Sequence, residues 1–351
     1  MPKKLKLGSL FDGIGGWCLS AVRNGIEPVW SSEIDPFCME VTKKHFPKVM
    51  QLGDVTKING AEIEPVDIIC AGSPCQNFSQ AGNKKGLCGS ESGLFTEFIR
   101  IVRQMRMSTC GLYPKMCVWE NVCGAKSRNS GMDFRAIIKM FTQTDIPVPR
   151  SRKWADAGLV RSGLCDVGWR VFNAEHFGLP QSRKRIFLVA DFRKGHRCAE
   201  KILFECKGDS WDFKAGKKGK TFPQSIEKRN DVAGGFEKKS PSDCDCVPIS
   251  CRMRCGKAGG GKGALLVFDK VFTLSTRNDQ IIFQEMDGKY IVRKLMPVEM
   301  ERLQGIPENW TMIDSKLCNS TSRCRAIGNG MAQPVSDWIF KRIVNFINWE
   351  E

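Results

Sequence analysis

Short apolar runs alternate with stretches of helical periodicity through the first half of the chain. Runs rich in Val, Ile and Leu predict strands at residues 5–11, 28–34, 66–71, 116–119, 170–173 and 185–189. Between them, apolar residues spaced three and four positions apart predict helices over 94–105 and 134–141. Strands that alternate with helices indicate an α/β fold, in which helices cover a mostly parallel sheet.

The pattern changes after Asp191. Residues 193–265 are rich in Lys, Gly, Ser and Cys and show little periodicity, and short strands are predicted next, at 265–268, 271–274 and 281–283. A helix and turn are predicted over 300–310, and an amphipathic helix over 335–346. We therefore expect one domain built from residues 1–192 and 320–351, a smaller irregular β-rich domain at 193–300, and a connection at 301–319.

Basic residues are concentrated in the middle of the chain. Lys and Arg number 54 against 38 Asp and Glu, which gives a formal charge of +16 over 351 residues. Residues 103–192 carry 15 basic and 7 acidic side chains, and residues 193–270 carry 18 and 10, whereas the two flanks are balanced. A basic surface of this kind favours a polyanionic partner, of which nucleic acid is the commonest.

Composition argues against several classes of protein. Hydrophobic residues make up 42% of the chain and aromatic residues 9%, which is enough for a packed core. No apolar run reaches the roughly 18 residues of a membrane span, and the basic start lacks the apolar core of a signal peptide. The 17 cysteines are odd in number and scattered, which indicates free thiols in a reducing cytoplasm.

Two local features allow more than one interpretation. Cys244, Cys246, Cys251 and Cys255 lie close together, but their spacing is not that of a paired zinc ribbon, so free thiols are favoured over zinc and no metal ligand is assigned. The basic segment Pro147–Gly163 is compatible with a contact to DNA and equally with a cap on the sheet.

A glycine-rich turn follows the first predicted strand. The sequence Phe11-Asp12-Gly13-Ile14-Gly15-Gly16 leads into a helix, and glycines there let the backbone approach a ligand closely. Glu33 ends the next strand, a position from which a carboxylate can hold a ribose diol. Cys18 stands where a dinucleotide fingerprint has its third glycine, so the NAD pattern is broken. Alone, the turn is also compatible with simple packing.

A candidate nucleophile follows the third predicted strand. Cys75 lies in Gly72-Ser73-Pro74-Cys75, Glu120 ends another strand of the same sheet, and Arg183 and Arg185 precede or begin a further one. A thiol, a carboxyl group and arginines at one crevice suit addition of a thiolate to a ring that must be protonated. The alternatives are an inert thiol and a structural ion pair between Glu120 and Arg185.

Together these motifs resemble the cytosine-5 DNA methyltransferases of bacterial and phage type, over most of the chain and in the family's order. The matching segments are residues 11–16, Pro74-Cys75-Gln76, Glu120-Asn121-Val122, Gln181-x-Arg183-x-Arg185, Arg302–Pro307 and Ala326–Gly330. The resemblance implies a Rossmann-like methyltransferase domain, with a smaller target-recognition domain at 193–300. The 61 positions between Glu120 and Gln181 exceed the spacing in compact members, and Pro147–Gly163 looks inserted.

The resemblance implies S-adenosyl-L-methionine as the cofactor. Glu33 would hold the ribose hydroxyls, Asp54 the adenine amino group, and Phe11 would pack on the adenine ring. The full set of implied cofactor-binding residues is Phe11, Gly13, Ile14, Gly15, Glu33, Ile34, Asp54, Val55, Pro74, Leu94 and Asn329.

The resemblance also implies the catalytic roles. Cys75 would add to C6 of cytosine, which turns C5 into a carbon able to attack the methyl group. Glu120 would hydrogen-bond N3 and the amino group, a role that needs a proton on the carboxyl group. Arg185 would contact O2 with Arg183 in support, and no residue is assigned as the base for the C5 proton.

Double-stranded DNA is the partner that the resemblance implies, with the target cytosine flipped out of the helix. Residues 79–93 resemble the family's mobile active-site loop. Residues expected to contact DNA are Ser79, Lys84, Lys85, Thr273 and Arg277. We expect a monomer in the cytoplasm of a bacterial host or phage-infected cell, with any cognate restriction endonuclease acting separately.

Three other functions are weighed against this one. An RNA cytosine methyltransferase would share the fold, but the Cys-Phe-Thr signature of the transfer-RNA branch is absent. A catalytically silent DNA-binding relative is disfavoured because Cys75, Glu120 and Arg185 are all present. An NAD oxidoreductase is disfavoured by the broken glycine fingerprint and the basic charge.

Overall fold

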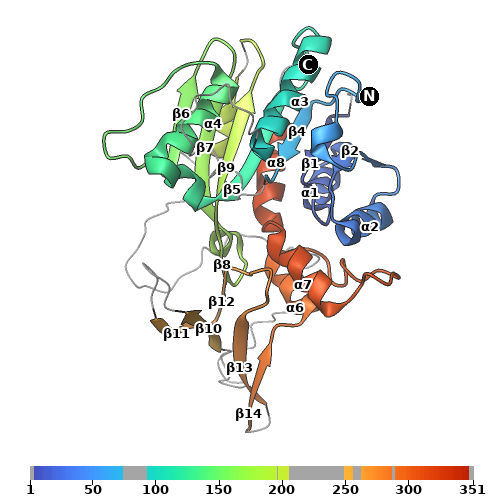
Figure 1. The fold of residues 1–351 in the computed structure, drawn as a ribbon, viewed down its shortest axis with the longest axis vertical. Helices are drawn as coiled ribbons and strands as arrows, with labels where there is room; N and C mark the ends of the chain where they lie inside the picture. Colours follow the sequence, from blue (N-terminus) through green and yellow to red (C-terminus); the bar gives the residue numbers. More distant parts are fainter. Residues whose placement is uncertain are drawn as a thin grey trace.

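A computed structural model describes residues 4–73, 93–195, 197–204, 249–255, 262–286 and 289–347. At its centre is an eight-stranded sheet in the order β3-β2-β1-β4-β5-β9-β7-β6, drawn in the upper part of Figure 1. Its strands are β1 (Lys6–Leu10), β2 (Glu27–Ser32), β3 (Met50–Gln51), β4 (Ile68–Ala71), β5 (Met116–Val122), β6 (Ala157–Arg161), β7 (Asp166–Asn173) and β9 (Lys184–Asp191).

Strands β3, β2, β1, β4 and β5 pair in parallel, and β7 also runs in their direction because β9 lies antiparallel between β5 and β7. β6 pairs antiparallel with β7 at the edge. The prediction of a mostly parallel sheet is thereby confirmed. The reversal of β9 has a local consequence: Arg185, near its start, pairs with Val122 at the end of β5.

Helices cover both faces of the sheet, and β4 is therefore apolar and buried at every residue (Figure 1). On one face, α3 (Leu94–Ser108) and α4 (Met132–Thr142) bury their aromatic residues in one core cluster. On the other face, α1 (Gly16–Arg23), α5 (Ala199–Leu203) and α8 (Gln333–Ile347) form a second cluster.

The helix α2 (Pro36–His45) begins three residues after Glu33, which directly follows β2. The Asp35 carboxylate accepts hydrogen bonds from the N–H groups of Phe37 (3.0 Å) and Cys38 (3.3 Å) and so caps the first turn. Pro36 stands at the first helical position, where its missing N–H costs nothing. Short 3₁₀ turns follow strands at η1 (Val55–Lys57), η3 (Cys123–Lys126), η4 (Arg128–Gly131) and η5 (Ala174–Phe177).

A second, antiparallel sheet of four strands in the order β11-β10-β13-β14 lies below the first in Figure 1. Its strands are β10 (Ile249–Cys255), β11 (Lys262–Phe268), β13 (Gln280–Met286) and β14 (Lys289–Lys294). A short parallel pair, β8 (Gln181–Ser182) with β12 (Val271–Phe272), connects this part of the chain to the start of β9.

Two further helices, α6 (Pro297–Gln304) and α7 (Ser320–Asn329), lie between the two sheets (Figure 1). A third core cluster joins Ile14 and Val41 of the first part to Leu274, Ile282 and Leu295 of the second. The glycine turn and the second sheet therefore share one apolar core.

Most predicted strands and helices are present, with shifted ends. The strand predicted to stop at Trp119 extends to Val122, so Glu120 lies within β5 rather than beyond it. The helix predicted from residue 300 begins at Pro297. Strands β3, β6, β8, β10 and β14 and helices α2, α5 and α7 were not predicted, and α5 packs on β7 and α8 although residues 193–265 looked irregular. The division into domains stays a prediction.

No helix among the described residues is both long enough and apolar enough to cross a membrane. Within the same ranges, no three His, Cys, Asp or Glu side chains gather as a metal site. Of the four clustered cysteines, Cys251 is buried in β10, while Cys244 and Cys246 lie outside the described residues.

Candidate active site

The glycine turn between β1 and α1 has one open side and one packed side. Phe11, Gly13 and Gly15 have positive φ values of 56°, 59° and 83°. Apart from its chain neighbours, no atom of the described residues lies within 4 Å of a Cβ built on Gly13, whereas a Cβ on Gly15 would come 2.9 Å from the Phe46 ring. Gly15 therefore combines a left-handed backbone with a contact that leaves no room for a side chain. The turn can present its backbone to a ligand on the Gly13 side.

Glu33 organises this turn from the end of β2. One carboxylate oxygen accepts a hydrogen bond from the Gly13 N–H (2.9 Å), and the other accepts from the N–H groups of Ile34 (2.8 Å) and Asp35 (2.9 Å). A carboxylate has about four acceptor positions, so one stays available for a ligand hydroxyl. The predicted pairing of the glycine turn with Glu33 is thus present in the structure.

The predicted adenine side lies next to Glu33. Ile34 is 71% exposed, which leaves an apolar surface for a ring to cover. The Ser32 hydroxyl donates to the Gly53 carbonyl at 2.6 Å and brings Asp54 to the end of β2. Asp54 accepts from the N–H and hydroxyl of Thr56, and these hydrogen bonds lower the pKa of its carboxyl group. Asp54 is therefore ionised and able to accept from an amino group.

The remaining predicted cofactor residues approach the turn from two directions. Phe11, Val55 and Leu94 pack against the same core cluster. Asn329 is exposed at the end of α7, and the chain after it closes on the turn: the Gln333 side chain donates to the Gly16 carbonyl at 2.7 Å. The start of α8, four residues after Asn329, is thus tied to the glycine turn. Pro74 lies outside the described residues.

Two side chains of β5 fix the chain where it leaves β4. The Trp119 indole N–H donates to the Ser73 hydroxyl at 2.9 Å, and the Asn121 side-chain amide donates to the Ser73 carbonyl at 3.0 Å. Ser73 is 4% exposed, so both bonds are shielded from water. Cys75 follows two residues later, outside the described residues. The anchoring role of Ser73 was not predicted, although a hydroxyl directly before Pro74-Cys75 was a usable signal.

Glu120 and Arg185 face one another across the end of β5 and the start of β9. The register pairs Glu120 with Phe187 and Val122 with Arg185, so the two side chains are diagonal neighbours on one face. Arg185 Nε lies 3.2 Å from Glu120 Oε1, and the two side chains are only 16% and 14% exposed. The structure therefore brings together two of the predicted catalytic residues.

Burial governs the ionisation of Glu120. Desolvation raises the pKa of its carboxyl group, while the positive charges of Arg185 and Arg183 oppose the rise. Among the described residues its Oε1 atom is buried without a hydrogen-bond partner, because the contact with Arg185 is an ion pair without hydrogen-bond geometry. A ligand that hydrogen-bonds here would satisfy that oxygen.

Arg183 is buried and acts between segments rather than toward the crevice. Only 2% exposed, it donates to the carbonyls of Leu274 (3.2 Å), Gly328 (3.3 Å) and Gly330. Burial, with help from Arg185, lowers its pKa to about 9, while Glu120 acts in the opposite direction. Arg183 thus links three segments of the chain, and its supporting role in catalysis stays a prediction.

Gln181 links β8 to α6 and to the loop after β12, a role that was not predicted for it. Its side chain donates to the Leu303 carbonyl (2.8 Å) and accepts from the Leu274 N–H (3.0 Å), with no exposed surface. The Thr273 hydroxyl donates to the Ser182 carbonyl at 2.6 Å, so it too links β8 to β12. Arg277 is exposed in the turn after them. Ser79, Lys84 and Lys85 lie outside the described residues.

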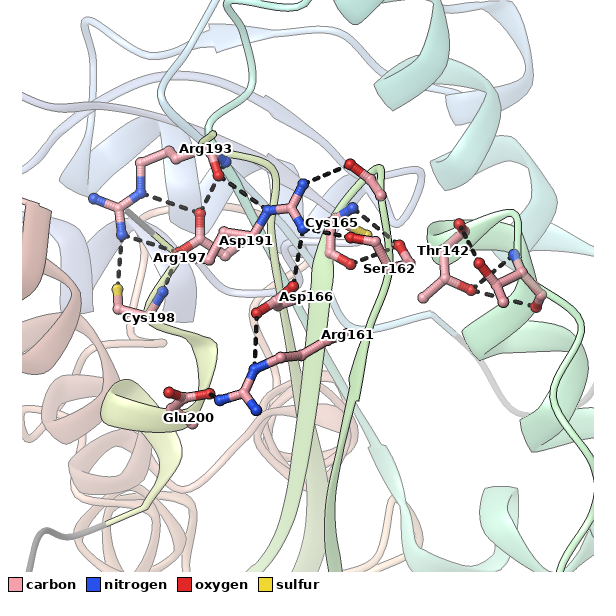
Figure 2. A network of polar contacts seen from close by, with 12 residues as sticks. Thr142, Arg161, Ser162, Cys165, Asp166, Asp191, Arg193, Arg197, Cys198 and Glu200 are labelled. Atoms are coloured by element: carbon pink, nitrogen blue, oxygen red, sulfur yellow. Dashed lines mark hydrogen bonds and ion pairs between the residues drawn. The ribbon is translucent and has the colours of Figure 1, made fainter. Parts of the chain in front are cut away.

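A separate network of arginines and carboxylates lies at the other end of β5. Figure 2 shows Asp191 bound by Arg193 (2.9 Å), and Asp166 bound by Arg197 (3.0 Å). Asp191 pairs with Met116, the first residue of β5, whereas Glu120 is near the last. The network joins residues 193–198 to the β6–β7 hairpin and is structural.

The comparisons with known proteins decide the family. A family model described as "C-5 cytosine-specific DNA methylase" matches residues 5–345, nearly the whole chain. The chain belongs to this family. The sequence-based prediction of a DNA cytosine-5 methyltransferase is therefore confirmed, while the roles of the individual site residues stay a prediction.

Several relatives support the assignment to the DNA methylases. The chain is 35% identical over 355 residues to "Type II methyltransferase M.MspI" of Moraxella sp, covering 96% of this chain and 70% of that protein. It is 25% identical over 467 residues to a "DNA N-6-adenine-methyltransferase" of Escherichia phage P1, covering 98% of this chain and 62% of the phage protein. The methylase thus spans less than two thirds of that phage relative.

The solved structures confirm the fold of the methylase. The S. pombe Dnmt2 methyltransferase aligns with a TM-score of 0.57 and 15% identity, covering 98% of this chain and 100% of that one. At this identity the likeness concerns the fold alone. It confirms a methyltransferase domain with a mostly parallel sheet and an additional smaller sheet.

Proposed function

We propose that this methylase uses Cys75, Glu120, Arg183 and Arg185 to methylate C5 of a cytosine in duplex DNA, with S-adenosyl-L-methionine as methyl donor. One observation carries the proposal. A Cβ built on Gly72, where the chain leaves β4 toward Cys75, lies 3.9 Å from the Glu120 carboxylate. The acid and the entry to the nucleophile's loop therefore share the crevice at the carboxyl ends of β4 and β5.

The glycine turn fits S-adenosyl-L-methionine. The open side of Gly13 offers a backbone contact for the cofactor. The remaining acceptor position of Glu33 suits a ribose hydroxyl, and the exposed Ile34 side chain suits the adenine ring. Gly15 and Ile14 would line the methionine end, while Asp54 and Val55 would border the adenine with Phe11. Pro74, Leu94 and Asn329 complete the proposed pocket. When bound, this cofactor supplies an electrophilic methyl group on a sulfonium.

Cys75 and Glu120 act on two different atoms of the base, Cys75 as the nucleophile at C6 and Glu120 as the hydrogen-bond donor at N3. The thiolate of Cys75 forms a bond to C6, and the ring electrons move toward N3, where protonated Glu120 donates a hydrogen bond. C5 is then rich enough in electrons to accept a methyl group, which a cofactor held at Gly13 and Glu33 would supply as its sulfonium becomes a neutral thioether. Loss of the C5 proton, together with cleavage of the bond between C6 and Cys75, restores the aromatic ring and the thiolate.

The two arginines have different parts in this proposal. Arg185 is close enough to Glu120 to hold the orientation of its carboxyl group, and its guanidinium can donate to the base O2. Arg183 is a positioning residue, since its two terminal nitrogens donate to backbone carbonyls of Leu274 and of the α7–α8 junction. It keeps the start of β9, and hence Arg185, in place.

DNA is the proposed polyanionic partner of the basic middle of the chain. The target base must leave the helix to reach the crevice, and Ser79, Lys84 and Lys85 are proposed to contact the DNA around it. Thr273 and Arg277, in the connection between the two sheets, are proposed to lie along the DNA from the other side. We further propose a monomeric enzyme of the cytoplasm, with any restriction endonuclease acting as a separate protein.

Expression in a methylation-free bacterial host tests this function. Genome-wide mapping should detect 5-methylcytosine in one short sequence context, and the Cys75→Ser protein should produce none. Because the phage P1 relative is named for adenine N6, N6-methyladenine is mapped in the same samples. N6-methyladenine without 5-methylcytosine, or no modified base at all from folded protein, would contradict the proposal. Methylation of RNA but not of duplex DNA would show that the substrate is RNA and not DNA.

A further inference from the structure

Trp310, in the segment between α6 and α7, reaches across to the glycine turn. Its indole N–H donates to the Ile14 carbonyl at 2.8 Å, and the side chain is 8% exposed. The other side of the same peptide unit is also held, because the Gly15 N–H donates to the Asp12 carbonyl at 3.2 Å. The Ile14–Gly15 peptide is therefore fixed at both its oxygen and its nitrogen.

Two residues at the end of α2 fix the indole ring in turn. The His45 ring stacks on Trp310 with centroids 3.5 Å apart and planes 4° apart, and its Nε2 bonds to the Trp310 carbonyl at 2.7 Å. Since a carbonyl only accepts, Nε2 carries the hydrogen. The Phe46 ring packs against the indole, with ring centroids 5.8 Å apart, and also fills the space beside Gly15. Ring, histidine and turn thus form one packed unit.

The backbone around Trp310 is held by a buried carboxylate. Glu301 has no exposed surface and accepts from the N–H groups of Asn309 (2.7 Å) and Thr311 (2.9 Å) and from Arg323 (3.0 Å). These bonds hold the residues on both sides of Trp310. An indole with so little freedom is a suitable support for a backbone turn.

We propose that Trp310 is a positioning residue for the cofactor turn, acting through the Ile14 carbonyl. The inference rests on the proposed function, because it takes Gly13, Ile14 and Gly15 as the contacts of S-adenosyl-L-methionine. Without the indole N–H, the Ile14–Gly15 peptide can rotate, and the backbone facing the cofactor loses its fixed orientation. Trp310 is not among the proposed contacts of the cofactor or the base, and it belongs to the part of the chain that follows the second sheet.

Trp310→Phe and Trp154→Phe form a matched pair that separates positioning from folding. Trp154 also donates its indole N–H to a backbone carbonyl, that of Gly131, at 2.8 Å, and it is 9% exposed. Each variant keeps an aromatic ring and loses one buried hydrogen bond. Only the bond of Trp310 ends on the proposed cofactor turn.

The dissociation constant of S-adenosyl-L-methionine is measured by calorimetry for both variants and the wild type. We expect Trp310→Phe to bind about five- to tenfold more weakly, the effect of about one hydrogen bond, and Trp154→Phe to stay within about twofold of wild type. The KM for the cofactor should rise with Trp310→Phe while kcat at saturation changes little. His45→Ala, which removes the stacked ring, is a second variant and should weaken binding in the same direction.

The outcomes separate this inference from the function on which it rests. Equal cofactor affinity in all folded variants, or equal weakening in Trp310→Phe and Trp154→Phe, overturns the positioning role and leaves the proposed function intact. A folded wild type that does not bind S-adenosyl-L-methionine overturns the proposed function itself. A selective loss in Trp310→Phe and His45→Ala supports the inference.

Discussion

Replacing Glu120 by glutamine should reduce the rate of methyl transfer by about two to four orders of magnitude, the usual contribution of a positioned acid. Glutamine keeps the size of the side chain and can donate an amide hydrogen bond, but it cannot transfer a proton to N3 of the base. Burial raises the pKa of the Glu120 carboxyl group and so favours the protonated form that the proposed step requires. Binding of S-adenosyl-L-methionine should change little, because Glu120 is not among the proposed cofactor contacts.

The rate is measured at saturating cofactor with DNA carrying the mapped target sequence. Glu64→Gln is the matched control, since Glu64 also pairs with a cation, Lys6, but at a half-exposed site away from the crevice. Because the pKa of the Glu120 carboxyl group is raised, wild-type activity should fall as the pH increases through that pKa. This fall in activity at high pH should be absent in Glu120→Gln. An unchanged rate in folded Glu120→Gln would remove this residue from the mechanism.

Replacing Arg183 by alanine should lower the free energy of unfolding by about 3 kcal/mol or more, because several buried carbonyls lose their donor at once. The guanidinium joins the start of β9 to the loop after β12 and to the α7–α8 junction. These segments come from three distant parts of the sequence, so a smaller side chain cannot restore the contacts by local adjustment. Cofactor binding should also suffer, since the α7–α8 junction closes on Gly16.

Urea unfolding of Arg183→Ala, compared with Arg161→Ala, measures this effect. Arg161 also forms ion pairs, with Asp166 and Glu200, but its side chain is 64% exposed. An exposed ion pair contributes little, so Arg161→Ala should cost less than about 1 kcal/mol. Equal losses in the two variants would mean that Arg183 does not hold the three segments together.

The placement of two site segments next to strands β2 and β4 was predicted, although the exact ends of several strands were not. Glu33 directly follows β2, and the chain after β4 leads to Cys75, as the alternation of strands and helices suggested. The direction of β9 was not predictable, because periodicity carries no information on strand direction. Only the antiparallel pairing of β5 with β9 explains why Arg185 meets Glu120.

Long-range hydrogen bonds were the part that sequence patterns could not supply. Trp310 and Ile14 are 296 positions apart, and Gln181 and Leu303 are 122 apart. Nothing local distinguishes these side chains from ordinary buried residues. In the structure they connect the cofactor turn and the arginine motif to the helices that follow the second sheet, so both halves of the proposed site depend on the same connection.

The central claim, a covalent bond between Cys75 and the target base, is tested most directly with duplex DNA containing 5-fluorocytosine at the mapped site. Fluorine replaces the proton that must leave C5, so the bond to C6 cannot be broken after methyl transfer. With S-adenosyl-L-methionine, the wild-type protein should form a denaturation-resistant complex whose mass equals protein, DNA and one methyl group. Peptide mapping should place the DNA on Cys75, and Cys75→Ser should bind this DNA without forming the complex. No adduct from wild-type protein that binds both DNA and cofactor, or an adduct on another residue, would contradict the account.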